Sequence, residues 1–128
     1  VRRGAVDAPD KGEDRTMTDP ATDIQQTKQA YREAILAHAR ALQARQRAKA
    51  HLERSVAHAR YEQQLEGKNE GDREAHAREL FADLYAAVED AEIEVLAARA
   101  DLDAAFLDYQ TARDLASLAA GFPLERAA

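Results

Sequence analysis

Apolar residues recur at alternating steps of four and three along the C-terminal half of the chain, and this repeat constrains the fold more than any other feature. The repeat spans about six heptads, which exceeds the three or four that indicate a coiled coil. We therefore predict one helix over about 70–120 that packs along a second helix. The repeat positions are Ala77, Phe81, Leu84, Val88, Ala91, Val95, Ala98, Leu102, Ala105, Tyr109, Ala112, Ala116 and Ala119.

Small and bulky residues alternate within this stripe. Alanine holds almost every second position, which lets two helix backbones approach closely. The bulky positions form the predicted interaction seam, namely Phe81, Leu84, Val88, Val95, Leu102 and Tyr109.

A weaker stripe with the same steps precedes it and predicts a first helix over about 20–66. Asp19 followed by Pro20 is typical of an N-cap and a first helical residue. Polar residues interrupt the middle of this stripe. Its positions are Tyr31, Ile35, His38, Leu42, Arg45, Lys49, Leu52, Val56 and Ala59.

The stretch LEGKNEGDREAH, from Leu65 to His76, contains the turn signals Gly67, Lys68 and Asn69. Glycine after a helix end adopts positive φ at little cost, and asparagine is a good N-cap. A loop of two or three residues then makes the helices antiparallel. We expect Asp72 to reach back to the Asn69 N–H.

Folding back near Lys68 makes the numbers of paired residues sum to about 136. The expected pairs across the seam are Tyr31 with Ala105, Ile35 with Leu102, Leu42 with Val95, and Leu52 with Leu84. Arg45 and Lys49 then lie opposite Glu89, Asp90 and Glu92.

Alanine also explains why a single hairpin has a thin core. Hydrophobic residues make up 45% of the 128-residue chain, but 30 of those 58 are alanine. A second group of apolar residues lies partly outside the seam, so we predict an all-α antiparallel two-helix hairpin whose copies dimerise into a four-helix bundle. This group consists of Ile93, Leu96, Phe106, Leu107, Leu115 and Leu118.

Charge favours the same pairing of helices. Eight basic and five acidic residues lie between Asp23 and Glu66, whereas four basic and twelve acidic residues lie between Asp72 and Ala119. The first helix also contains a basic run that either neutralises the acidic helix or contacts a nucleic-acid backbone. The run is Arg40, Arg45, Arg47, Lys49, Arg54 and Arg60. A net charge of −6 argues against a generally basic nucleic-acid binder.

Several features argue against an enzyme, and we expect no catalytic, cofactor or metal site. The chain has no cysteine, and no nucleophile–base pair is evident. His58 with Glu62 and His76 with Glu79 are spaced for a zinc site, but exposed positions on alanine-rich helices are the better interpretation. The Gly67–Lys68–Asn69 turn lacks the long glycine-rich run of a phosphate loop.

The ends of the chain differ from the middle. Residues 1–18 are polar and aperiodic, so we predict a disordered tail before the hairpin of residues 19–120. Met17 is a candidate natural start, which would make residues 1–16 upstream sequence. Gly121 and Pro123 predict the end of the last helix and a short tail over residues 121–128. With no signal peptide or membrane-spanning run, a cytoplasmic location is expected.

The turn and second helix resemble small coiled-coil hairpin proteins of phages and prophages. The matching residues are Gly67, Lys68, Asn69, Arg73 and Ala75, followed by an Ala/Leu heptad helix. The likeness covers about Tyr61 to Leu118 and departs at Gly71, where that pattern has a helix former. The resemblance implies a helical hairpin and no enzymatic activity.

Taken together, these patterns predict a cytoplasmic protein-interaction or scaffolding coiled coil that binds itself and another protein. The alternative is a nucleic-acid-associated factor, of the phage recombination or nuclease-modulating type, that uses the basic run of the first helix.

Overall fold

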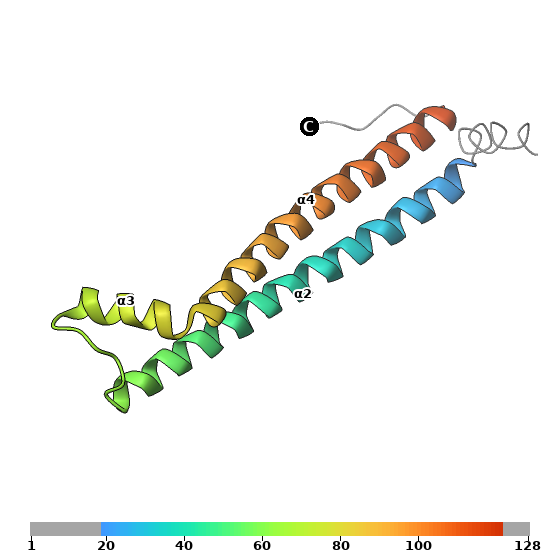
Figure 1. The fold of residues 1–128 in the computed structure, drawn as a ribbon. Helices are drawn as coiled ribbons and strands as arrows, with labels where there is room; N and C mark the ends of the chain where they lie inside the picture. Colours follow the sequence, from blue (N-terminus) through green and yellow to red (C-terminus); the bar gives the residue numbers. More distant parts are fainter. Residues whose placement is uncertain (1–18, 122–128) are drawn as a thin grey trace, which may run out of the picture. The chain divides into compact units, whose positions relative to one another are not determined.

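A computed structural model describes residues 19–121, which form helices and connections without any strand. The three helices are α2 (Pro20–Tyr61), α3 (Glu70–Leu80) and α4 (Ala82–Ala119), and α2 and α4 are by far the longest (Figure 1). The all-helical prediction is therefore confirmed. The predicted disordered tail over 1–18, the start at Met17 and most of the C-terminal tail lie outside the described residues.

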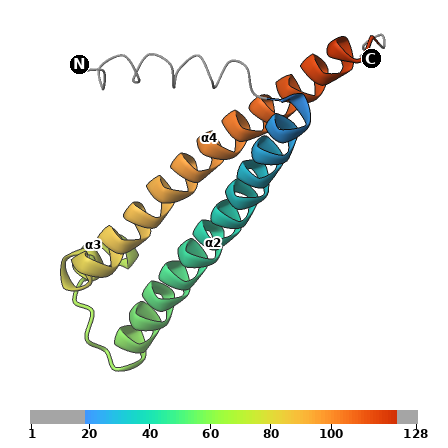
Figure 2. The same ribbon diagram turned by 90° about the vertical axis from the view of Figure 1, so that its right-hand side faces the viewer.

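The chain divides into two compact units. One unit, residues 34–102, contains the second part of α2, the connection, α3 and the first part of α4. The other combines the described residues up to Glu33 with those from Asp103 onward. In each unit a segment of α2 lies beside an antiparallel segment of α4, as Figures 1 and 2 both show.

The outer ends of the long helices form as expected. The carboxylate of Asp19 accepts a hydrogen bond from the Thr22 N–H at 3.3 Å, which caps the start of α2. At the other end, α4 stops at Ala119 and Gly121 has φ +83°. Both termini therefore follow from local sequence.

The inner end of α2 differs from the prediction, because the helix stops at Tyr61 rather than near Glu66. Gln63 adopts the left-handed conformation with φ +57°. Its N–H donates to the Arg60 carbonyl at 3.0 Å, and the Gln64 N–H donates to the Ala59 carbonyl at 2.8 Å. These two bonds make a Schellman motif, which satisfies the last carbonyls of the helix five residues early.

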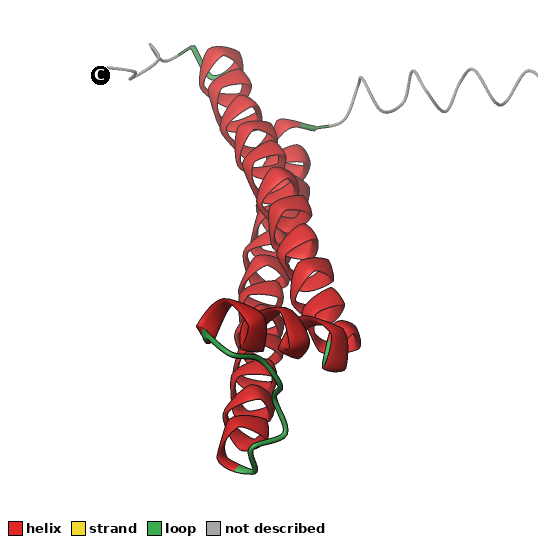
Figure 3. Ribbon diagram, turned by 60° about the vertical axis from the view of Figure 1, so that its left-hand side comes forward, coloured by secondary structure: helices red, strands yellow, loops and turns green. Residues whose placement is uncertain are grey.

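The early stop lets Leu65 fold back onto the helices. Leu65 is buried in a small cluster with Ala59 and Ala77, and Val56 and Phe81 pack against it. The connection over residues 62–69 is therefore longer than the predicted two or three residues (Figure 3). Burial of one leucine favours this arrangement by roughly 1.5–3 kcal/mol.

Asn69 caps α3, as predicted. Its side-chain oxygen accepts a hydrogen bond from the Asp72 N–H at 2.9 Å. The Asp72 carboxylate accepts from the Lys68 N–H at 3.3 Å, and not from the Asn69 N–H as expected. Gly67 has the predicted positive φ, at +147°, but lies in the connection and not at the end of α2.

The predicted second helix is two helices, and this prediction of one continuous helix was wrong. Phe81 ends α3 with φ −113° and ψ 35°, and α3 then runs in a different direction from α4 (Figures 1 and 3). The Phe81 N–H donates to the Ala77 carbonyl at 2.8 Å, while its own carbonyl accepts from the Leu84 and Tyr85 N–H groups. Phe81 thereby packs on the Leu65 cluster without leaving its backbone groups unpaired.

The apolar stripe, which begins in α3 and continues along α4, faces α2. Every repeat position from Ala77 to Ala116 is buried or half-buried, and Ala119 is exposed. On α2 the pattern needs a correction: Ala34 and Ala41 are half-buried, whereas Ile35 and Leu42 are 42% and 36% exposed. At these two places the seam contains the smaller residue of the neighbouring pair, which fits a close approach of the two backbones.

The expected partner of Tyr31, Ala105, is close to the observed contacts in the unit that contains the chain ends. Tyr31 lies against Phe106, with ring centroids 5.4 Å apart, and stacks on Tyr109 at 5.9 Å. Tyr31 therefore contacts the residue after Ala105 and the residue one turn further along α4.

Candidate interaction surfaces

An exposed row of apolar residues lies on the side of α4 that faces away from α2. Within residues 103–121 the row consists of Ala104, Leu107, Leu115 and Leu118, with Thr111 between the leucines, and we call these five residues the outer stripe. Steps of three and four place these residues on one helix face. This face is roughly 130° around the helix from the seam, at about 100° per residue.

The leucines of the outer stripe are well exposed. Leu107, Leu115 and Leu118 are 60%, 56% and 58% accessible to solvent. In the other unit, Ile93 and Leu96 of α4 are 63% and 71% exposed. Exposed apolar residues gathered on one helix face are typical of a protein-binding site.

Acidic residues border the outer stripe. At helical spacing, Asp108 lies on one side of it, and Asp103 and Asp114 lie on the other. All of α4 contains nine acidic residues and only two basic ones, Arg99 and Arg113. The surface is therefore an apolar row between two acidic edges.

The predicted interaction seam serves a different purpose. Of its six residues, Val95 is buried and the other five are half-buried against their own unit: Phe81, Leu84, Val88, Leu102 and Tyr109. These side chains hold helices together within the chain. All six apolar residues predicted to lie partly outside the seam are exposed, although Phe106 also contacts Tyr31.

The six residues of the predicted basic run separate into two groups, of which the first consists of Arg45, Lys49 and Arg60. Lys49 and Arg45 are half-buried near the seam: Lys49 Nζ lies 3.8 Å from a Glu92 carboxylate oxygen, and Arg45 Nε is buried without a hydrogen-bond partner. The pairing of Lys49 with an acidic residue of α4 confirms the sequence-based expectation. Arg60 lies in an ion pair with Glu70.

Arg40, Arg47 and Arg54 form the second group, which we call the basic row. They are seven residues apart, all are exposed, and none has an ion-pair partner among residues 19–121. Seven residues are close to two helical turns, so the three side chains lie on one face. Successive arginines are about 10 Å apart along the helix axis.

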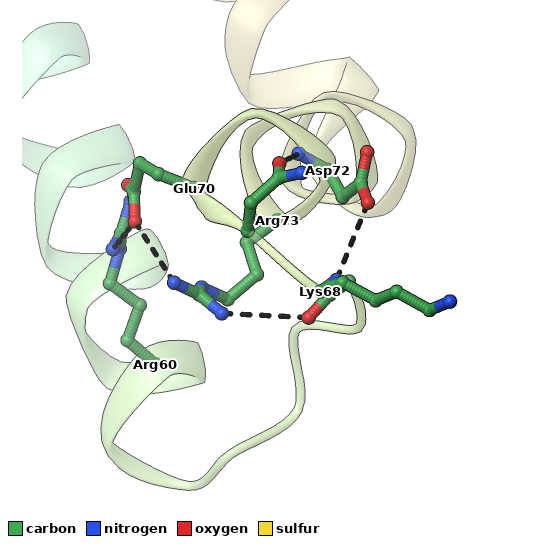
Figure 4. A network of polar contacts seen from close by, with 7 residues as sticks. Arg60, Lys68, Glu70, Asp72 and Arg73 are labelled. Atoms are coloured by element: carbon green, nitrogen blue, oxygen red, sulfur yellow. Dashed lines mark hydrogen bonds and ion pairs between the residues drawn. The ribbon is translucent and has the colours of Figure 1, made fainter.

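A polar network ties α3 to the end of α2 (Figure 4). The Arg60 guanidinium donates two hydrogen bonds to the Glu70 carboxylate, one of them at 3.2 Å. Arg73 lies 3.5 Å from both a Glu70 oxygen and the Gly67 carbonyl oxygen. Sequence reasoning missed this network because its partners are brought together by the Schellman turn at Gln63.

This network shifts two pKa values. The hydrogen bonds from Arg60, followed by the charges of Arg60 and Arg73, lower the pKa of Glu70 below its usual 4.5. The same pairing raises the pKa of Arg60.

A pocket of about 300 Å³ beside the network is lined by Arg60, Gln63, Leu65 and Arg73. Both arginines of the pocket lining already donate to acceptors of the network.

The histidine positions weighed for zinc do not come together as a site. His76 Nδ1 accepts a hydrogen bond from the Glu66 N–H at 2.9 Å, and His58 is exposed on α2. Within residues 19–121 the His, Asp and Glu side chains form no group of three or more that could bind a metal ion.

Among the helices of residues 19–121, none is both long and apolar enough to cross a membrane.

Comparison with known proteins gives no relative. No protein-family model, no curated protein and no solved structure matches the chain. The resemblance to phage and prophage hairpin proteins therefore stays a prediction, and function is argued from the surfaces alone.

Proposed function

We propose that the chain is a non-enzymatic protein-interaction module that binds its partner through the outer stripe of α4. The observation that carries this proposal is the exposure of Leu107, Leu115 and Leu118 in one row. Complete burial of a leucine side chain contributes roughly 1.5–3 kcal/mol, and a partner that covers these partly exposed leucines would gain about half of that for each.

A second copy of the chain is one partner within this proposal. Two copies that join through their outer faces would give the predicted dimer and, with suitable packing, a four-helix bundle. Such a dimer brings the acidic edges of two α4 helices together. Sedimentation equilibrium would then show a dimer that is stabilised as salt concentration rises, because salt screens like charges.

Photo-crosslinking tests the proposed surface directly. The chain has no cysteine, so Leu107→Cys and Leu36→Cys each accept a single benzophenone label. Leu36 is a matched control, because it is 53% exposed and belongs to a different helix, α2. In a lysate of the source cells, position 107 should give discrete protein adducts that position 36 does not give. The same adducts from both positions would contradict the proposal.

The basic row supports a second candidate function, nucleic-acid binding of the phage recombination or nuclease-modulating type. Arg40, Arg47 and Arg54 present three cations on one face without an ion-pair partner in the described part of the chain, and phosphate contacts of this kind are sequence-independent and salt-sensitive. Aromatic residues for base stacking do not lie between them.

A gel shift at low salt tests this candidate. Loss of one phosphate contact in Arg47→Gln should weaken binding to DNA and lower the salt slope by about one. Arg32→Gln, an exposed arginine outside the basic row, should change binding much less. Absence of a shift with both single- and double-stranded DNA would reject nucleic-acid binding.

A further inference from the structure

We propose that two copies of the chain associate through one side of the unit of residues 34–102, with each α2 packed against the α4 of the other copy. All residues that support this inference belong to that unit. The surface is separate from the outer stripe, so the inference goes beyond the proposed function and does not depend on it.

The ion pair between Lys49 and Glu92 identifies this side. The two side chains meet across the seam, with Lys49 Nζ 3.8 Å from a Glu92 carboxylate oxygen. Leu42 precedes Lys49 by about two helical turns, and Leu96 follows Glu92 by about one turn. Both leucines therefore lie on the same side of the helix pair as the ion pair, one on each helix.

Both helices expose apolar residues on this side. Ile35 lies about two turns before Leu42 on the same face of α2. Ile35, Leu42 and Leu96 are all exposed, and we call these three residues the apolar side. Since α2 and α4 both contribute to it, a partner can pack against two helices at once, as in a four-helix bundle.

The charged residues of this unit gather elsewhere around the helices. The basic row lies about 120–160° around α2 from Leu42. On α4, Glu94 and Asp101 lie about 140–160° from Leu96. Association through those charged faces would take ions out of water without burying bulky apolar residues, which is costly. The apolar side is therefore the better surface for association.

Charge determines which helices meet in the dimer. Residues 34–61 of α2 contain six basic residues and one acidic residue, whereas residues 82–102 of α4 contain six acidic residues and one basic residue. Packing α2 on α2 would place like charges together, and packing α2 on the α4 of the second copy places opposite charges together. A two-fold axis parallel to the helices gives the second arrangement and makes all neighbouring helices antiparallel.

The register within one copy determines which residues meet across the axis, because such an axis keeps every residue at its own height. From the Lys49–Glu92 ion pair, Leu42 lies within about one turn of the height of Leu96. Lys49 lies within about one turn of the height of Glu89, which has no ion-pair partner among residues 19–121. Each Leu42 then contacts Leu96 of the second copy, and each Lys49 is close to Glu89 of the second copy.

Mixed disulfide formation tests this contact in the full-length chain. The chain has no cysteine, so Leu42→Cys and Leu96→Cys each add a single thiol. The two variants, one of them isotope-labelled, are mixed in equal amounts and oxidised, and the covalent dimers are identified by mass. The control mixture contains Leu36→Cys in place of Leu42→Cys, because Leu36 is exposed about 120° around α2 from Leu42.

Disulfides between positions 42 and 96 should exceed the half share that random pairing gives, and the control mixture should not exceed it. A disulfide between these two variants forms only between two copies. Random pairing of positions 42 and 96, or an excess of disulfides between two copies of position 42, would overturn the proposed packing of α2 on α4.

Sedimentation equilibrium tests the apolar and charged contacts separately. Leu96→Gln should raise the dissociation constant of the dimer by about tenfold or more, and Leu36→Gln by less than about twofold. Glu89→Lys places like charges together and should raise it by about fivefold. Glu94→Lys makes the same change of net charge on another face of α4 and should have less than about a twofold effect. Circular dichroism checks that each variant keeps the helical content of the parent.

The salt dependence separates this dimer from one that forms through the outer stripe. Opposite charges meet here, so rising salt concentration should weaken the dimer. A parent chain that stays monomeric, a dimer that salt stabilises, or equal effects of Glu89→Lys and Glu94→Lys would overturn the inference. If position 107 gives no protein adducts while positions 42 and 96 form the mixed disulfide, the proposed function falls and this inference stands.

Discussion

Gly67 approaches Asp72 so closely that a Cβ atom on residue 67 would lie 2.4 Å from the Asp72 Cβ and 2.8 Å from the Arg73 nitrogen. Its φ of +147° is also a conformation that other residues rarely adopt. The backbone before α3 therefore requires glycine for two independent reasons. This contact places the Lys68 N–H where the Asp72 carboxylate accepts it.

Gly67→Ala should destabilise the fold by about 1–3 kcal/mol, because the new Cβ meets backbone atoms and the φ angle becomes strained. Urea denaturation followed by circular dichroism measures the change. Gly71→Ala is the matched control: its Cβ would meet only the Asn69 side-chain oxygen at 3.3 Å, and alanine is a better helix former in α3. Equal losses for the two variants would contradict the account of this turn.

Ala59→Leu should destabilise the chain by about 1–3 kcal/mol, since Ala59 is 1% exposed in the cluster with Leu65 and Ala77. Ala57→Leu adds the same bulk to an exposed position two residues away and should be close to neutral. The difference between their urea midpoints measures how closely the helices approach. Similar midpoints for both variants would show that the cluster has room for a larger residue.

Much of the seam could be predicted from sequence because it depends on periodicity. The steps from Ala77 to Ala116 place residues on one face whatever the details of the connection, and burial follows that face. The caps at Asp19 and Asn69 were also predictable, because each uses the residue's own side chain.

The connection could not be predicted in the same way. The residue that ends α2 in the left-handed conformation is Gln63, although Gly67 is the stronger local signal. Likewise, the break at Phe81 contains neither glycine nor proline. Both depend on the cluster around Leu65, which forms only when segments distant in sequence meet. The pairing of Arg60 with Glu70 depends on the same tertiary contact.

Tyr31→Leu should lower stability by about 0.5–1.5 kcal/mol, because leucine keeps apolar bulk but loses the ring interactions with Tyr109 and Phe106. Tyr31→Phe keeps the ring and should be close to the parent protein. Urea midpoints of the two variants give the comparison. A larger loss for the phenylalanine variant would indicate that the hydroxyl group, and not the ring, stabilises this unit.

The stabilising contribution of Glu70 should depend on pH. Because its pKa is lowered in the folded state, the contribution is complete above the usual value of 4.5 and is lost as pH falls through the lower folded value. The parent protein should therefore be more stable than Glu70→Gln at pH 7, and the difference should shrink at about pH 3. A difference that is the same at both pH values would contradict the ion pair with Arg60.

The central claim is that the outer stripe of α4 is open in the free chain and is the surface that a protein partner covers. Thiol reactivity at Leu107→Cys tests both parts. In the free chain, this cysteine should react about as fast as the one in Leu36→Cys. Addition of a lysate of the source cells should then slow the reaction at position 107 alone. Strong protection of position 107 before any lysate is added, or equal slowing at both positions after its addition, would contradict the claim.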